Sequence, residues 1–166
     1  IHDLAAGGVI ITTGDTATQT MGKTIVSDNI IYDFSQIYTI YNPAVGIKGH
    51  GAEVSHNEIY NCAHCAISIC AGQCDIAYNN VHDCCLEVGD GGAIYTWGRF
   101  IWAGNVFRYN YVHRIGDILN PILGLSRPGA GSGMFFDFWG KYSLCYGNVF
   151  ADVRGCCMCG ASGHMT

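Results

Sequence analysis

The stretch Ser55-His56-Asn57-Glu58-Ile59-Tyr60-Asn61 places an asparagine directly before an alternating apolar run. The same arrangement occurs five times, and the asparagines of the five copies are Asn29, Asn57, Asn79, Asn110 and Asn148. Their separations of 28, 22, 31 and 38 residues are typical of stacked supersecondary units, with loops inserted in the longer intervals. The opening Ile1-His2-Asp3 matches the tail of a further copy, which predicts that the chain starts part-way through a coil.

Two further apolar segments accompany each asparagine. One is bounded by glycine or alanine, as in Ala66-Ile67-Ser68-Ile69, and the other leads into the asparagine, as in Glu53-Val54-Ser55. Such short, β-rich runs predict strands rather than helices. Three short strands per repeat predict an all-β, right-handed parallel β-helix of about six coils. We expect one domain over residues 1–166, with a loop insertion at 117–132.

The asparagines have a structural role in this fold. A side-chain amide carries donors and an acceptor, so identical residues on successive coils can form a hydrogen-bonded ladder along the axis. His82 and His113 each lie three residues after such an asparagine. Their shared position predicts that they stack on each other rather than bind a metal.

Composition restricts the class of protein. The chain has 166 residues, of which 49% are hydrophobic and 13% charged, which indicates one compact domain. The net charge of -5 and the lack of a lysine or arginine cluster argue against a nucleic-acid partner. No apolar run approaches the roughly 20 residues of a membrane span, so we expect none. No cofactor is predicted.

Ten cysteines are present, and two share a repeat position. Cys62 and Cys84 each lie five residues after a ladder asparagine, where other copies carry Phe34, Ile115 and Val153. This predicts a core position, in which the two cysteines either form a disulfide along the axis or remain buried thiols. Disulfides would indicate a secreted protein. Cys62-x-x-Cys65 has metal-site spacing, but no second pair follows at zinc-ribbon distance, so no metal site is predicted.

One stretch resembles a known family. It runs from Cys84 to Arg99 through Gly89-Asp90-Gly91-Gly92. Together with His64 and Gly133-Met134-Phe135-Phe136-Asp137, it is similar to parallel β-helix proteins of the glycoside hydrolase family 141 type, within the pectate-lyase-like superfamily. The resemblance extends over nearly the whole chain and implies activity on carbohydrates. Because related β-helices include fucosidases, xylanases and lyases, it does not fix the reaction.

The chain departs from the family pattern at two polar positions. After Gly98-Arg99 the family usually continues with Asp-Trp, whereas this chain has Phe100-Ile101-Trp102. Where relatives often have two consecutive aspartates, this chain has Asp137-Phe138.

Aromatic side chains follow one predicted strand and its neighbour on the next coil. If Ile94 and Thr96 point inward, Tyr95 and Trp97 point outward. Sugar rings present C–H faces to aromatic rings while their hydroxyls need polar partners, so an exposed aromatic strip flanked by carboxylates suits a saccharide. The predicted platform comprises Tyr95, Trp97, Phe135 and Trp139. The alternative is that these rings only cover the sheet.

Glycoside hydrolysis needs two carboxyl groups. Asp90 and Asp137 are the predicted pair, on neighbouring coils, and Glu87 is the reserve; a purely turn-forming role is the alternative for Asp90. We expect Arg99 to bind a substrate carboxylate or hydroxyl and His64 to orient an acid, unless both make only surface contacts.

Two functions follow from these patterns. The first is a secreted carbohydrate-active protein, glycoside hydrolase-like, that acts on or binds a polysaccharide. A lyase fits less well, because Arg99 would be the only base near the aromatic strip. The second is a structural subunit of an extracellular filament or coat, formed by end-to-end association of coils without obvious caps.

Overall fold

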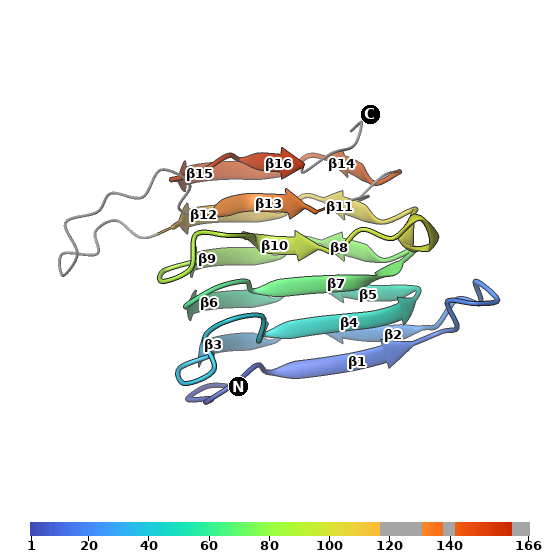
Figure 1. Cartoon of the computed structure of the whole chain (residues 1–166), viewed down its shortest axis with the longest axis horizontal. Coiled ribbons are helices and arrows are strands. Elements are labelled where there is room, and N and C mark those ends of the chain that lie inside the picture. Colours follow the sequence, from blue (N-terminus) through green and yellow to red (C-terminus); the bar gives the residue numbers. More distant parts are fainter. Residues whose placement is uncertain (117–130, 138–141, 161–166) are drawn as a thin grey trace.

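A computed structural model describes residues 1–116, 131–137 and 142–160, and it shows a three-sided parallel β-helix (Figure 1). The prediction of an all-β fold with three short strands per coil is confirmed. The first sheet, in front in Figure 1, contains β1 (Val9–Thr13), β4 (Val45–His50), β7 (Ile67–Gly72), β10 (Gly92–Thr96), β13 (Ser132–Phe136) and β16 (Met158–Gly160).

The other two sheets form the remaining sides of the coil. The second contains β2 (Thr24–Ser27), β5 (Ala52–Ser55), β8 (Asp75–Ala77), β11 (Val106–Arg108) and β14 (Leu144–Tyr146). The third contains β3 (Ile30–Phe34), β6 (Glu58–Cys62), β9 (Asn80–Cys84), β12 (Tyr111–Ile115) and β15 (Val149–Val153). A short 3-10 helix, η1 (Phe100–Trp102), follows β10. No helix in the described part of the chain is long and apolar enough to span a membrane.

Register follows the sequence repeat. Ile59 on β6 pairs with Ile31 on β3 and with Val81 on β9, and all three side chains are fully buried. Because side chains alternate along a strand and coils stack without a shift, each inward position becomes a column of apolar side chains. These columns fill the interior of the coil, where their burial supplies the main stabilisation of the fold.

The asparagine ladder forms as predicted at the corner between the second and third sheets. Asn57 donates from both its backbone N and its Nδ2 to Oδ1 of Asn79, at 3.1 and 3.0 Å. Its Nδ2 also donates to the carbonyl of Val26 at 2.9 Å. The same double donation links Asn29 to Asn57, Asn79 to Asn110 and Asn110 to Asn148. The ladder therefore satisfies the buried polar groups of each corner.

A left-handed residue precedes every ladder asparagine. Its φ lies between 54° and 67° in all five copies, at Asp28, His56, Tyr78, Tyr109 and Gly147. One residue in this conformation turns the chain sharply enough to join two strands of different sheets. The strain of placing non-glycine residues there is offset by the hydrogen bonds of the ladder.

The first residues continue the repeat. The backbone N of Tyr32 donates to the carbonyl of Ile1 at 3.1 Å, and that of Leu4 donates to the carbonyl of Asp33 at 2.9 Å. The ring of His2 stacks on Tyr32 at 4.9 Å. The predicted match of Ile1-His2-Asp3 to the tail of a copy is confirmed.

Cys62 and Cys84 occupy the predicted core column. Cys62 pairs with Phe34 and Cys84 with Ile115, and both side chains are buried. All ten cysteines lie in the described part of the chain and are free thiols. Of the two alternatives, the structure therefore has the buried thiols: Cys62 Sγ donates to the carbonyl of His64 at 3.4 Å, and Cys84 Sγ to that of His82 at 3.2 Å.

The last residue of the predicted insertion at 117–132 belongs to a strand. Residues 117–130 lie outside the described part, whereas Ser132 already belongs to β13 and is buried. The composition of Gly131-Ser132-Gly133 is typical of a loop, but these glycines allow close packing against neighbouring coils.

Candidate functional site

Aromatic rings gather on the outer face of the first sheet. Tyr95 on β10 lies in register with Phe135 on β13, and their rings stack at 5.6 Å with planes 9° apart. Trp97, just after β10, contacts Tyr95 edge-on at 5.6 Å. Ile94 and Thr96, on either side of Tyr95, are 1% and 3% exposed, as the predicted alternation requires.

Tyr41 completes this cluster from a different element. It comes from the loop between β3 and β4, and its ring lies 5.8 Å from Tyr95, 5.6 Å from Trp97 and 4.7 Å from His64. Its side chain remains partly exposed. Tyr41 is not among the predicted site residues, because its loop lies outside the repeat. The signal in the sequence that points to this loop is the run Ile37-Tyr38-Thr39-Ile40-Tyr41, which is apolar or aromatic except for Thr39.

Tyr95 differs from the expected exposed platform. It is only 2% exposed, because Tyr41, Trp97 and Phe135 surround it. Its phenol donates a hydrogen bond to Oδ2 of Asp137. Burial and this hydrogen bond raise the pKa of Tyr95, so the phenol keeps its proton and remains a donor. The accessible parts of the cluster are Tyr41 and the half-buried Trp97 and Phe135.

Asp137 sits at the edge of the cluster. It directly follows β13, its backbone N donates to the carbonyl of Thr96 at 2.9 Å, and its side chain is half-buried. A carboxylate beside aromatic rings, oriented by a buried phenol, can accept hydrogen bonds from the hydroxyls of a bound ligand.

His64 organises the backbone around the cluster. Its Nδ1 accepts a hydrogen bond from the backbone N of Tyr41 at 3.1 Å, so its proton lies on Nε2, which donates to the carbonyl of Asp90 at 2.9 Å. Burial lowers the pKa of His64, which keeps the ring neutral. His64 therefore holds the Tyr41 loop against the turn of Asp90, and its bond is to the backbone of Asp90 rather than to the carboxyl group.

The predicted acids lie at opposite ends of two paired strands of the sheet, β10 and β13. Asp90 and Glu87 are exposed in the turn before β10, whereas Asp137 comes after the end of β13. Gly92 pairs with Ser132 and Thr96 with Phe136, so the length of β10 separates the two positions. The pairing of Asp90 with Asp137 as two catalytic carboxyl groups stays a prediction.

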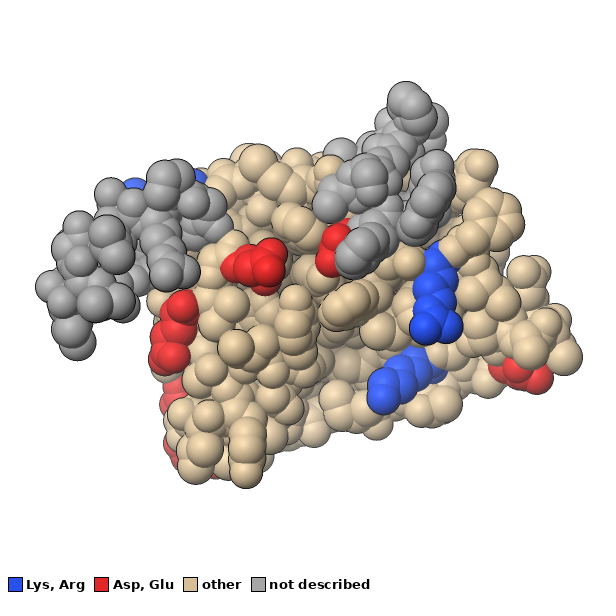
Figure 2. Space-filling model, in the orientation of Figure 1, with Lys and Arg blue, Asp and Glu red and all other residues tan. Residues whose placement is uncertain are grey.

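Two cations act on Cys70 of β7. Burial raises the pKa of this thiol, and the positive charges of Lys48, which pairs in register with it, and of Arg99 oppose that rise. The guanidinium of Arg99 also lies over the ring of Trp102 at 5.1 Å. Figure 2 shows that this face otherwise carries few charged side chains. Trp139, the remaining predicted platform residue, lies outside the described residues.

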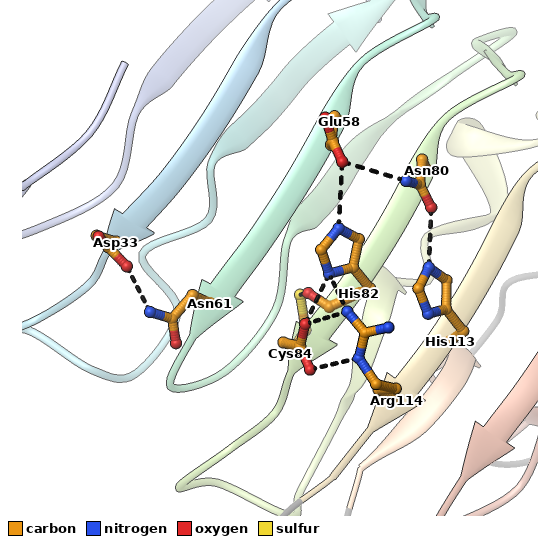
Figure 3. Close-up of polar contacts among 9 residues, drawn as sticks. Asp33, Glu58, Asn61, Asn80, His82, Cys84, His113 and Arg114 are labelled. Carbon is orange, nitrogen blue, oxygen red and sulfur yellow. Dashed lines mark hydrogen bonds and ion pairs between the residues drawn. The ribbon is translucent and has the colours of Figure 1, made fainter.

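A separate polar cluster covers the third sheet (Figure 3). Arg114 donates to both carboxylate oxygens of Asp83, at 2.8 and 2.6 Å, and His82 contacts Asp83 at 2.7 Å. Hydrogen bonding from Arg114 lowers the pKa of Asp83 to about 2. His82 and His113 stack at 4.8 Å and are largely buried, which confirms the predicted stacking. Among the described residues no group of three or more His, Cys, Asp or Glu could hold a metal ion.

No protein-family model matches the chain, and no curated protein or solved structure matches it either. The assignment of the fold as a parallel β-helix rests on the three stacked parallel sheets of the structure.

Proposed function

We propose that the protein is carbohydrate-active and that it binds a polysaccharide on the outer face of the first sheet, as glycoside hydrolase family 141-type β-helices would. The observation that carries this proposal is the packing of Tyr41, Trp97 and Phe135 around Tyr95, whose phenol donates a hydrogen bond to the carboxylate of Asp137. Partly exposed rings offer apolar faces to the C–H groups of a pyranose, and the carboxylate accepts its hydroxyls. An extracellular location goes with such a ligand.

Binding is better supported than hydrolysis. In the two-carboxylate mechanism one group protonates the leaving oxygen and the other acts as nucleophile or activates water. Asp137 is half-buried beside the rings and suits the second of these roles. Asp90 and Glu87, in the turn before β10, are the candidates for the acid.

A screen of plant and algal polysaccharides tests this proposal. Wild-type protein and Asp137→Asn are compared for retention on each immobilised polysaccharide and for release of reducing ends. The proposal requires that at least one polysaccharide retain the wild type and that Asp137→Asn weaken that retention at least fivefold. Retention without reducing ends would mean binding only. If no polysaccharide retains the wild type, the proposal fails.

A structural subunit that stacks end to end is the second candidate. Within the described residues, Oδ1 of Asn29 accepts no hydrogen bond, although each later ladder oxygen accepts two. Exposed Ile25 and Ile30 lie in the first coil, and exposed Leu144 and Val149 lie at the equivalent positions of the last. A second copy that extended the ladder would cover both pairs. Electron microscopy of wild type and Ile30→Asp tests this candidate: filaments that the variant loses would favour it, and a wild type that stays monomeric at high concentration would exclude it.

A further inference from the structure

The loop between β3 and β4 exposes a run of apolar side chains. Ile37 is 72% exposed, Tyr38 64% and Ile40 55%, and all three lie within four residues of each other. No charged residue occurs from Ser35 to Val45. Single exposed apolar residues are ordinary on a protein surface, but a contiguous apolar patch usually marks a binding surface.

The backbone of this loop is anchored on both sides. The backbone N atoms of Ile37 and Tyr38 both donate to the carbonyl of Ala5, at 3.0 and 2.9 Å. On the other side, Tyr41 donates to His64, and the side chain of Asn42 donates to the carbonyl of Ile40 at 2.8 Å. The apolar side chains are thus presented to solvent on a fixed backbone, a form of preorganisation that favours ligand binding.

The patch is continuous with the candidate saccharide site. Tyr41 belongs to the same loop and also packs against Tyr95, Trp97 and His64 in the ring cluster. A ligand held by the rings can therefore extend onto the loop. Ile37 and Ile40 offer no side-chain hydrogen-bonding group, and Tyr38 adds one phenol hydroxyl, so this surface suits an apolar group better than a further hydroxyl-rich sugar unit.

We propose that Ile37, Tyr38 and Ile40 form a subsite for an apolar group, an alkyl, acyl or aryl substituent, carried by the saccharide that binds at Tyr41 and Asp137. This inference rests on the proposed saccharide binding. A protein partner fits less well, because stable protein interfaces use about 20–30 residues on each side, whereas this loop presents four exposed apolar or aromatic side chains, Ile37, Tyr38, Ile40 and Tyr41.

Matched glycosides test the subsite. Methyl and octyl β-D-glucopyranoside, galactopyranoside and xylopyranoside are titrated calorimetrically, below the micelle concentration of each octyl compound, with 1-octanol as the sugar-free probe. For at least one sugar we expect the octyl glycoside to bind at least tenfold more tightly than the methyl glycoside, about 1.4 kcal/mol. We expect octanol to bind at least tenfold more weakly than that octyl glycoside.

Two double variants localise the effect. Ile37→Ser with Ile40→Ser should reduce the octyl preference to less than threefold and leave methyl glycoside binding unchanged. Ile25→Ser with Ile30→Ser, which changes exposed isoleucines on other faces, should preserve the preference. Circular dichroism confirms that the variants are folded.

The failures are distinguishable. Equal binding of methyl and octyl glycosides, or a preference that survives the loop variant, overturns the subsite and leaves saccharide binding intact. Octanol that binds as tightly as octyl glycoside also overturns it, as does loop-dependent dimerisation without any octyl preference. If no glycoside of any sugar binds, the subsite and the proposed function fail together.

Discussion

Asn57 donates two hydrogen bonds to a single oxygen, Oδ1 of Asn79, one from its backbone N and one from its side-chain amide. Both asparagines are fully buried. Each step of the ladder therefore joins two coils through a side chain that also satisfies the backbone of its own corner. Hydrogen bonds of the asparagine ladder therefore link the coils at one corner, and apolar side chains fill the interior.

Asn79→Ala should destabilise the protein by about 3–5 kcal/mol, measured by urea unfolding. The substitution removes both bonds from Asn57 and the bonds that Nδ2 of Asn79 donates to Val54 and Asn110. It leaves buried backbone groups without partners. Asn80→Ala, on the half-buried outer face, is the matched control and should cost less than about 1 kcal/mol. Equal losses for the two variants would contradict a structural role for the ladder.

Thiol labelling distinguishes buried free thiols at Cys62 and Cys84 from a disulfide between them. Both side chains are buried, whereas Cys156 and Cys157 are exposed. In native protein, N-ethylmaleimide should modify Cys156 and Cys157 and leave Cys62 and Cys84 unmodified. After denaturation without reductant, mass spectrometry should show all ten cysteines alkylated. Two fewer, with Cys62 and Cys84 protected, would establish the disulfide instead.

The Asp83–Arg114 pair predicts an acid-dependent loss of stability. The pKa of Asp83 is lowered from 3.8 to about 2, so its contribution is complete above pH 4 and disappears as the pH falls toward 2. Because the pair is partly exposed, we expect Asp83→Asn to cost only about 1 kcal/mol at pH 7. The difference in the free energy of unfolding between Asp83→Asn and wild type should disappear near pH 2. A constant gap for Asp83→Asn from pH 7 to pH 2 would contradict the ion-pair explanation.

Gly91→Ala should disturb the candidate site. Gly91 has φ +150°, and a Cβ there would lie 2.6 Å from Nε2 of His64. The expected loss of stability is about 2 kcal/mol, together with a shift in the NMR signals of the His64 ring. Gly89→Ala, in the same turn but without positive φ, is the control and should leave the His64 signals in place. Unchanged signals in Gly91→Ala would mean that His64 does not hold this turn.

Repeat positions made the fold and its interior predictable. The ladder asparagines and the column of Phe34, Cys62 and Cys84 follow from spacing alone, because stacked coils place equivalent residues over each other. The site was less predictable. Tyr95 is buried by Tyr41, a residue from a loop that no periodicity describes. Asp90 and Asp137 do belong to neighbouring coils, but motif order does not reveal that one precedes its strand and the other follows it.

We propose that the rings around Tyr95, together with Asp137, form a saccharide-binding face, a claim that the affinities of two single-ring variants test. The dissociation constant of Trp97→Ala for a retained polysaccharide is compared with that of Tyr109→Ala, which removes an exposed aromatic ring at a different corner of the coil. We predict a loss of at least tenfold for Trp97→Ala and less than twofold for Tyr109→Ala. Equal affinities of the two variants and wild type would contradict the claim.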